Sequence, residues 1–120
     1  MRKLRLIVLF CFMICSSCIV YAEPNFTIYP TQNYWTQIEL DTRDGKMWQV
    51  QISPDNDKEI LKISLNLMPL TDSPEPGRFM LSPTKNMYNF VLLDTVNGRT
   101  WQVQWSTDLK YKRGIVAEIK

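Results

Sequence analysis

The second half of the sequence repeats the first. Residues Phe26–Ser53 align with Phe79–Ser106 at a constant offset of 53 without a gap, and 13 of the 28 aligned positions are identical. Both copies contain the string Leu-Asp-Thr-x-x-Gly-x-x-Trp-Gln-Val-Gln-x-Ser. A period of this length indicates that one supersecondary unit occurs twice.

Alternation of apolar and polar residues predicts that each unit is built from β-strands. Trp48, Val50 and Ile52 alternate with Gln49 and Gln51, which is the pattern of a strand with one buried face. By this pattern the glutamines lie on the face opposite the core. Further strands are predicted at residues 26–29, 36–40, 61–67, 79–82, 88–93 and 114–119.

Each copy also contains a predicted hairpin. Gly45 and Gly98 follow turn-forming residues and are expected in the left-handed region, after a type I turn. A register in which Thr42 opposes Lys46 places apolar residues opposite one another in both copies. The predicted pairs are Leu40–Trp48, Ile38–Val50, Leu93–Trp101 and Val91–Val103.

We therefore expect an all-β protein with two four-stranded antiparallel units packed as one sandwich or barrel. The units are residues 23–68 and 77–120, joined by a proline-rich linker over 69–77. Trp48 and Trp101 would face the core between them. The strand at 88–93 is apolar on both faces, so we expect it to be central or covered. A blade-like arrangement completed by a second subunit is the alternative.

The first 22 residues have the features of an export signal. A basic start is followed by an apolar stretch, and Val20-Tyr21-Ala22 offers small residues where a signal peptidase cleaves. The stretch is short for a membrane span. We expect an exported protein, in the periplasm, cell envelope or outside the cell. Cys15-Ser16-Ser17-Cys18 offers an alternative, a lipid anchor at Cys18.

Removal of the signal changes the charge and the cysteine content. All three cysteines lie inside it, so the remaining 98 residues cannot form a disulfide. Three of the 14 basic residues also lie there, leaving 11 against 12 acidic ones. Nothing in this balance favours nucleic acid as a partner.

The composition excludes several kinds of catalytic site. The sequence has no histidine, and no cysteine remains after the signal. The Ser-His-Asp and Cys-His nucleophiles and the usual zinc ligand sets therefore cannot form. Its four glycines are scattered and build no phosphate loop, and no cofactor is expected. For Asp41 and Asp94 we favour capping of their own turns. A paired acid and base, or oxygen ligands for calcium, are the alternatives. Asp55-Asn56-Asp57 weakly resembles a calcium loop.

Aromatic and methionine side chains outside the shared core offer a candidate partner surface. Such side chains are typical of interaction surfaces when they are exposed, although burial beneath the loop between the copies is the alternative. The candidates are Tyr34, Trp35, Met87, Tyr88 and Trp105.

The repeated strings are also similar to those of a known group of proteins. Pro-Thr-x-Asn-x-(Trp/Tyr), followed by the hairpin string, resembles small exported proteins of Bacteroides-type gut bacteria. The resemblance covers most of the chain after the signal. It implies export and a β fold, and it assigns no functional residues.

The sequence as a whole favours an exported, non-enzymatic binding domain for a protein or glycan ligand. An inhibitor or immunity-type protein is an alternative, and a small carboxylate-dependent hydrolase is a weaker one. Oligomer formation is compatible with each of these functions.

Overall fold

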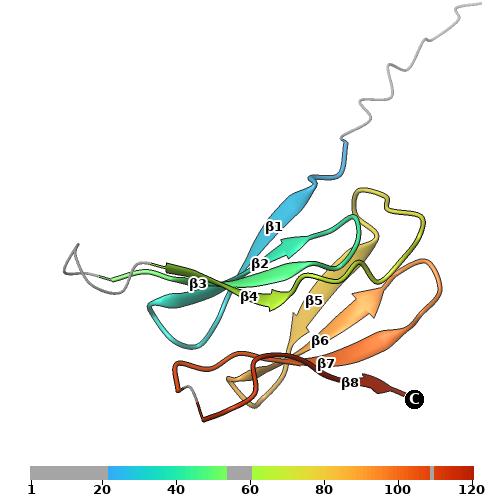
Figure 1. The fold of residues 1–120 in the computed structure, drawn as a ribbon. Helices are drawn as coiled ribbons and strands as arrows, with labels where there is room; N and C mark the ends of the chain where they lie inside the picture. Colours follow the sequence, from blue (N-terminus) through green and yellow to red (C-terminus); the bar gives the residue numbers. More distant parts are fainter. Residues whose placement is uncertain (1–21, 54–60, 109) are drawn as a thin grey trace, which may run out of the picture.

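The computed structural model describes residues 22–53, 61–108 and 110–120 (Figure 1). Apart from Ala22, the predicted export signal lies outside the described residues, as do Cys18 and the Asp55-Asn56-Asp57 string.

The described residues form eight strands, and each half of the chain makes its own antiparallel sheet. The strand orders are β1-β2-β3-β4 and β5-β6-β7-β8, so the prediction of an all-β protein with two four-stranded units is confirmed. In this part of the chain no helix is long and apolar enough to cross a membrane. The strands are β1 (Phe26–Pro30), β2 (Thr36–Asp41), β3 (Met47–Gln51), β4 (Leu61–Asn66), β5 (Phe79–Pro83), β6 (Asn89–Asp94), β7 (Thr100–Gln104) and β8 (Gly114–Ile119).

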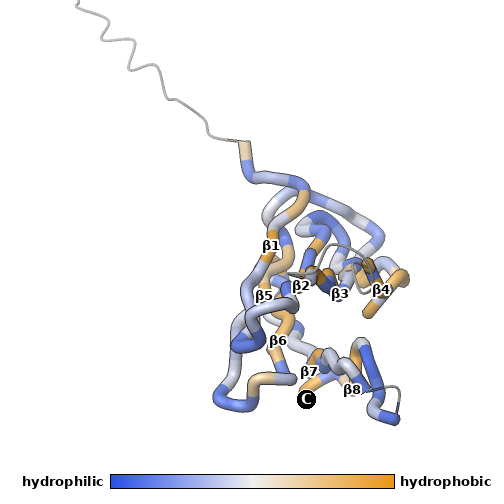
Figure 2. The backbone as a smooth tube through the Cα atoms, turned by 90° about the vertical axis from the view of Figure 1, so that its left-hand side faces the viewer, coloured by the Kyte–Doolittle hydropathy of each residue, from blue (hydrophilic) through white to orange (hydrophobic). Residues whose placement is uncertain are grey.

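The two sheets stack face to face as two layers (Figure 2). β2 contacts β5, and β4 contacts β8. The described strands of one sheet do not pair with those of the other, so the sheets form a sandwich rather than a closed barrel. The core between them consists of Ile38, Leu40, Met47, Leu65, Phe79, Leu81, Phe90, Leu92, Trp101, Val103 and Trp105.

The register of both hairpins differs by one residue from the prediction. Leu40 pairs with Met47, and Glu39 pairs with Trp48. In the second copy, Leu92 rather than Leu93 pairs with Trp101. The predicted apolar pairs are therefore wrong in both copies.

The cause is a hairpin loop that is one residue longer than expected. The N–H of Asp41 donates to the carbonyl of Lys46 at 2.8 Å, and the N–H of Gly45 donates to the carbonyl of Asp41 at 3.0 Å. Thr42 thus belongs to the loop, where its hydroxyl donates to the carbonyl of Pro24 at 2.7 Å. Gly45 has the predicted left-handed conformation, with φ of 86°.

The two sheets bury opposite faces of the repeated unit. Ile38 and Leu40 are 0% exposed, whereas their counterparts Val91 and Leu93 are half-buried on the outer side of the second sheet. If the side of the unit that carries Ile38 in the first copy and Val91 in the second is called its front, the front of the first sheet packs on the back of the second. The copies are stacked in the same orientation and are not related by a two-fold axis.

This stacking separates the two repeated tryptophans. Trp101 is buried in the core, but Trp48 is half-buried on the outer side, where Lys62 Nζ lies 4.7 Å from its ring centroid. The prediction that both indoles face the core is right for Trp101 and wrong for Trp48. Because the sheets meet front to back, equivalent residues cannot both lie between them.

A glutamine from the first sheet joins it to the second. Gln49 is 1% exposed; its Nε2 donates to the carbonyl of Ser106 at 3.0 Å and its Oε1 accepts from the N–H of Ser106 at 3.3 Å. The expectation that Gln49 faces away from the core is wrong. Its counterpart Gln102 does face outward, and its Nε2 donates to Asn89 Oδ1 at 2.7 Å.

β4 and β8 approach closely at a glycine. Gly114 has φ of 105°, and a Cβ atom placed on it would clash with the backbone carbonyl oxygen of Leu65. Glycine is the residue that permits both this conformation and this contact. Gly114 therefore sets how closely the outer ends of the two sheets pack.

Candidate functional site

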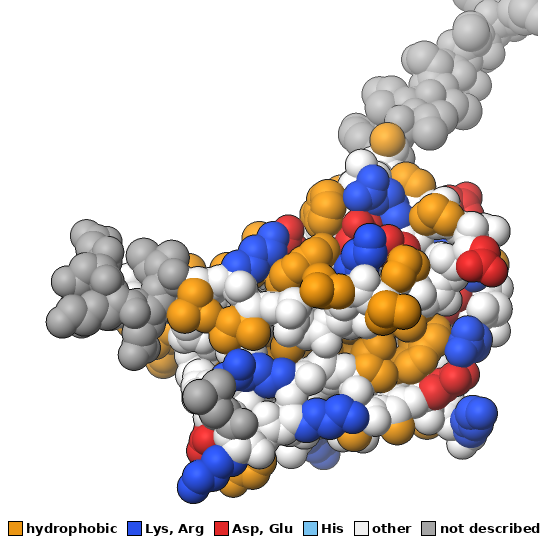
Figure 3. All heavy atoms as spheres, in the orientation of Figure 1, with side chains coloured by type: hydrophobic (Ala, Val, Ile, Leu, Met, Phe, Trp, Pro, Cys, Tyr) orange, Lys and Arg blue, Asp and Glu red, His pale blue; other side chains and the backbone are white. Residues whose placement is uncertain are grey.

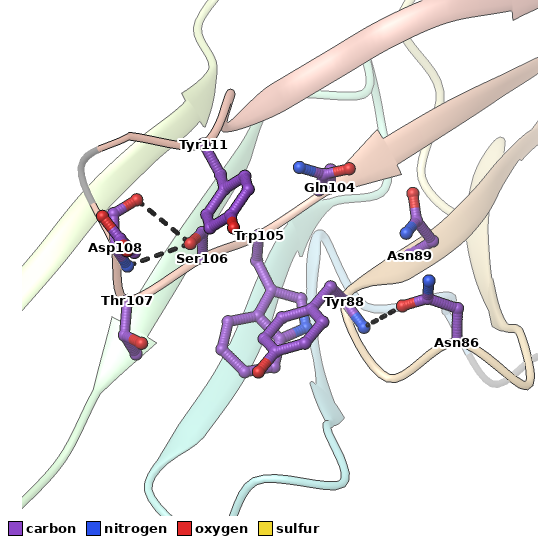
Figure 4. Close-up of a pocket in the computed structure, with 9 residues that line it drawn as sticks. All are labelled: Asn86, Tyr88, Asn89, Gln104, Trp105, Ser106, Thr107, Asp108 and Tyr111. Atoms are coloured by element: carbon purple, nitrogen blue, oxygen red, sulfur yellow. Dashed lines mark hydrogen bonds between the residues drawn. The ribbon is translucent and has the colours of Figure 1, made fainter.

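A pocket of about 500 Å³ opens beside the start of β6 and the end of β7 (Figure 4). One side comes from the loop before β6 and the other from the loop between β7 and β8. Two tyrosines, a tryptophan, amides, hydroxyls and one carboxylate line it, and none of the described lining residues is a lysine or an arginine. The lining residues are Asn86, Tyr88, Asn89, Gln104, Trp105, Ser106, Thr107, Asp108 and Tyr111.

The loop before β6 presents Tyr88 through an Asx turn. Asn86 Oδ1 accepts a hydrogen bond from the N–H of Tyr88 at 3.0 Å, which is the local bonding for which asparagine is favoured in turns. The hydroxyl of Thr84 braces the same loop by donating to the carbonyl of Asn89 at 2.9 Å. The repeated Pro-Thr-x-Asn string is thus a loop that holds an aromatic residue two positions after its asparagine.

The first copy contains the same loop. Asn33 Oδ1 accepts from the N–H of Trp35 at 2.8 Å, and the hydroxyl of Thr31 donates to the carbonyl of Thr36 at 2.6 Å. Trp35 therefore occupies the position of Tyr88. Neither Trp35 nor the 91% exposed Tyr34 lines the pocket.

The loop between β7 and β8 supplies the other wall. Ser106 Oγ accepts from the N–H of Asp108 at 2.9 Å, and Asp108 Oδ1 accepts from the N–H of Lys110 at 2.9 Å. The N–H of Tyr111 donates to the carbonyl of Asp108 at 3.2 Å. Tyr111, which is 62% exposed, extends beside the pocket from this loop.

Trp105 is the buried support of the pocket. Its side chain is 1% exposed, and its Nε1 donates to the carbonyl of Met87 at 2.8 Å. The ring of Tyr88 lies against it, with 4.9 Å between centroids and 49° between planes. Of the two alternatives for this side chain, exposure on a partner surface or burial, burial is therefore the one that holds for Trp105: its indole fills the core and positions Tyr88.

Three amide side chains are also held in place around the pocket. Gln104 Nε2 donates to the carbonyl of Lys112 at 3.0 Å, while Asn89 and Asn86 make the bonds described above. Each bond uses one polar atom of its side chain. The other polar atom of each amide is the one with which a ligand would bond.

Only part of the predicted partner surface lines the pocket. Tyr88 and Trp105 line it, and Met87 lies beside a neighbouring hollow between the two Pro-Thr-x-Asn loops. Sequence reasoning missed Asn86 and Asn89 as site residues, although they belong to or follow the repeated Pro-Thr-x-Asn string. It also missed Tyr111, which lies beyond the aligned repeat and offered no signal.

The two repeated aspartates cap their own hairpin loops, as the favoured hypothesis expected. Asp41 Oδ1 accepts from the N–H of Arg43, and Asp94 Oδ1 accepts from the N–H of Val96, both at 3.0 Å. Each carboxylate also forms two hydrogen bonds with a guanidinium, from Arg43 in the first copy and from Arg78 in the second.

These partners change the acidity of both aspartates. Burial by itself raises the pKa of each carboxyl, but the hydrogen bonds and positive charge of Arg43 and Arg78 outweigh it. The pKa of Asp41 and of Asp94 therefore lies below the ordinary value. Both side chains are thus held as anions in their turns.

The described residues contain no cluster of three or more His, Cys, Asp or Glu side chains that could hold a metal ion. The lining of the pocket offers aromatic rings for stacking and polar groups for hydrogen bonding.

Comparison with known proteins adds no further constraint on this site. No family model matches the chain, and no curated protein or solved structure matches it. The geometry of the pocket is therefore the basis on which a function is argued.

Proposed function

We propose that this protein is an exported, non-enzymatic binding domain that holds a carbohydrate in the pocket between Tyr88 and Tyr111. The observation that carries the proposal is the lining itself. Two partly exposed tyrosines stand among Asn86, Asn89 and Gln104, in a hollow of about 500 Å³. That volume lies within the range of about 300–1,000 Å³ typical of small-molecule sites.

A sugar has the chemistry that complements this lining. Its C–H faces are apolar and pack on aromatic rings, while its hydroxyls both donate and accept hydrogen bonds. The amides of Asn86, Asn89 and Gln104 offer donors and acceptors, and Asp108 offers an acceptor. Because no lysine or arginine lines the pocket, a phosphorylated or strongly acidic ligand fits less well.

The absence of histidine from the sequence, and of cysteine after the predicted signal, supports a binding role. Asp41 and Asp94 are engaged with their own loops and with arginines, and neither lines the pocket.

A glycan array followed by calorimetry with the best ligand tests the proposal. Tyr111→Ala and Tyr88→Ala should each weaken binding about tenfold or more, since aromatic stacking and the buried area are lost. Tyr34→Ala removes an equally large, more exposed side chain outside the pocket and serves as the matched control. Binding to no glycan, or binding that both pocket variants retain unchanged, would contradict the proposal.

Export is proposed from residues 1–22. Mass spectrometry of the protein from a bacterial host should find a first residue of Glu23. A diacylated or triacylated Cys18 would instead indicate a lipid-anchored form, and an intact Met1 would contradict export.

A further inference from the structure

The outer face of the first sheet carries apolar residues whose counterparts are buried in the second. Phe26 and Ile28 are 47% and 59% exposed, whereas the equivalent Phe79 and Leu81 are 1% and 2% exposed. This surface, termed the Trp48 face, consists of Phe26, Ile28, Trp48, Val50 and Ile52, with the charged Glu39 and Lys62 among them.

The outer face of the second sheet shows the reverse relationship. Val91 and Leu93 are half-buried there, whereas the equivalent Ile38 and Leu40 are fully buried in the first sheet. β6 is an internal strand, yet no described strand covers this side of it. This surface, termed the Val91 face, consists of Met80, Val91, Leu93, Thr100 and Gln102.

The two open faces correspond to the two faces that meet inside the molecule. Within the chain, the Ile38 side of the first copy packs on the Trp101 side of the second. The Val91 face of the second copy is equivalent in sequence to the Ile38 side of the first copy. The Trp48 face of the first copy is equivalent to the Trp101 side of the second. We propose that a second copy of this chain packs its Trp48 face on the Val91 face of the first, and so continues the internal stack.

An interface of this kind is head-to-tail. The two molecules use different surfaces, so each complex leaves one Trp48 face and one Val91 face open. Association therefore continues beyond a dimer, either as a filament or until a ring closes.

One feature of the Trp48 face sets the strength of this contact. Glu39 occupies the position of the buried Leu92, and its carboxylate pairs with Lys62 Nζ at 2.6 Å, over the ring of Trp48. The space-filling view likewise shows Lys and Arg side chains among hydrophobic ones on the side that it displays (Figure 3). Desolvation of the Glu39–Lys62 pair opposes association, so the wild-type contact is reversible. Replacement of both charged side chains, Glu39→Leu together with Lys62→Leu, should tighten the contact about tenfold or more. Glu39→Leu alone would leave the Lys62 ammonium unpaired in the interface.

Sedimentation of the chain from Glu23 onward, from roughly 10 μM to 1 mM, tests the proposal. The average mass of the wild type should rise past that of a dimer. Ile28→Glu disables the Trp48 face and Val91→Glu disables the Val91 face, so each variant alone should remain monomeric. An equal mixture of the two should form a dimer that grows no further, because one intact face of each kind remains. Circular dichroism checks that both variants keep the β fold.

Two outcomes would overturn the proposal. One is a wild type and a Glu39→Leu/Lys62→Leu double variant that both stay monomeric at every concentration. The other is a single-face variant that dimerises as the wild type does, which would indicate two-fold pairing of like faces. Tyr111→Ala should associate normally while losing sugar binding, so failure of the carbohydrate proposal is distinguishable from failure of this one.

Discussion

The carboxamide of Gln49 and the backbone of Ser106 form a two-bond pair across the interior, with the amide nitrogen and oxygen 3.0 and 3.3 Å from their partners. The side chain thereby satisfies a buried N–H and carbonyl at the end of β7, where the chain leaves its own sheet. Arg113 Nε also donates to the Ser106 carbonyl, at 2.8 Å. Gln49 therefore joins the sheets by the kind of hydrogen bonding that strands use within a sheet.

Gln49→Leu should lower the free energy of unfolding by about 1–3 kcal/mol, because it leaves the buried N–H of Ser106 without its partner. Urea denaturation measures the change. Gln102→Leu alters the equivalent position on the outer face and should cost less than about 1 kcal/mol. Equal losses in the two variants would contradict a special role for Gln49.

Gly114→Ala should destabilise the protein more than Gly98→Ala. Both glycines have positive φ, 105° and 78°, so each substitution incurs the left-handed cost of roughly 1–2 kcal/mol. At Gly98 nothing lies within 4 Å of the added Cβ, but at Gly114 the Cβ meets the Leu65 carbonyl. In thermal unfolding, the melting temperature of Gly114→Ala should therefore lie well below that of Gly98→Ala. The reverse order would refute the close approach of β4 and β8.

Arg78→Ala should be among the most damaging single changes to a charged residue. Asp94 is 0% exposed, and removal of the guanidinium leaves its carboxylate buried and unpaired, at a cost of about 3–5 kcal/mol. The control is Arg99→Ala, which breaks the solvent-exposed pair with Glu118 and should lower the stability far less. Chemical denaturation at pH 7 compares the two.

Stability should fall as the pH is lowered through the acid range. The pKa of Asp41 and of Asp94 is depressed in the folded protein, so their contribution is complete above the ordinary aspartate pKa of about 3.9. It is lost as the pH falls through the folded-state pKa, because protonation removes the bonds to Arg43 and Arg78. Urea midpoints between pH 7 and pH 2 should decrease less steeply for Asp94→Asn than for the wild type. An unchanged slope would contradict the assignment.

Trp105→Ala should cost about 3–5 kcal/mol, as expected for a large buried aromatic residue. Trp35→Ala, at the 43% exposed tryptophan of the first copy, should cost no more than about 1 kcal/mol. Guanidinium denaturation followed by circular dichroism separates them. A similar loss of unfolding free energy in both variants would mean that Trp105 is not a main support of the core.

Local chemistry made several features predictable. All eight strands fall within a few residues of their predicted positions, because alternation and turn residues mark them. Gly45 and Gly98 adopt the expected left-handed conformation, and Asp41 and Asp94 bond to the backbone of their own loops. Each of these features depends on residues that are neighbours in the chain.

The sequence by itself determined two four-stranded units and the chemistry of their turns. The tertiary structure alone decided which face of each unit is buried. Both faces of the repeat carry apolar residues, so the front-to-back stacking, rather than the pattern, sends Trp101 inward and Trp48 outward. It also decided the pocket, because Tyr88 and Tyr111 belong to loops separated in sequence, and the second has no counterpart in the repeat. Periodicity records which residues share a face, but only the partner sheet determines which face loses its contact with water.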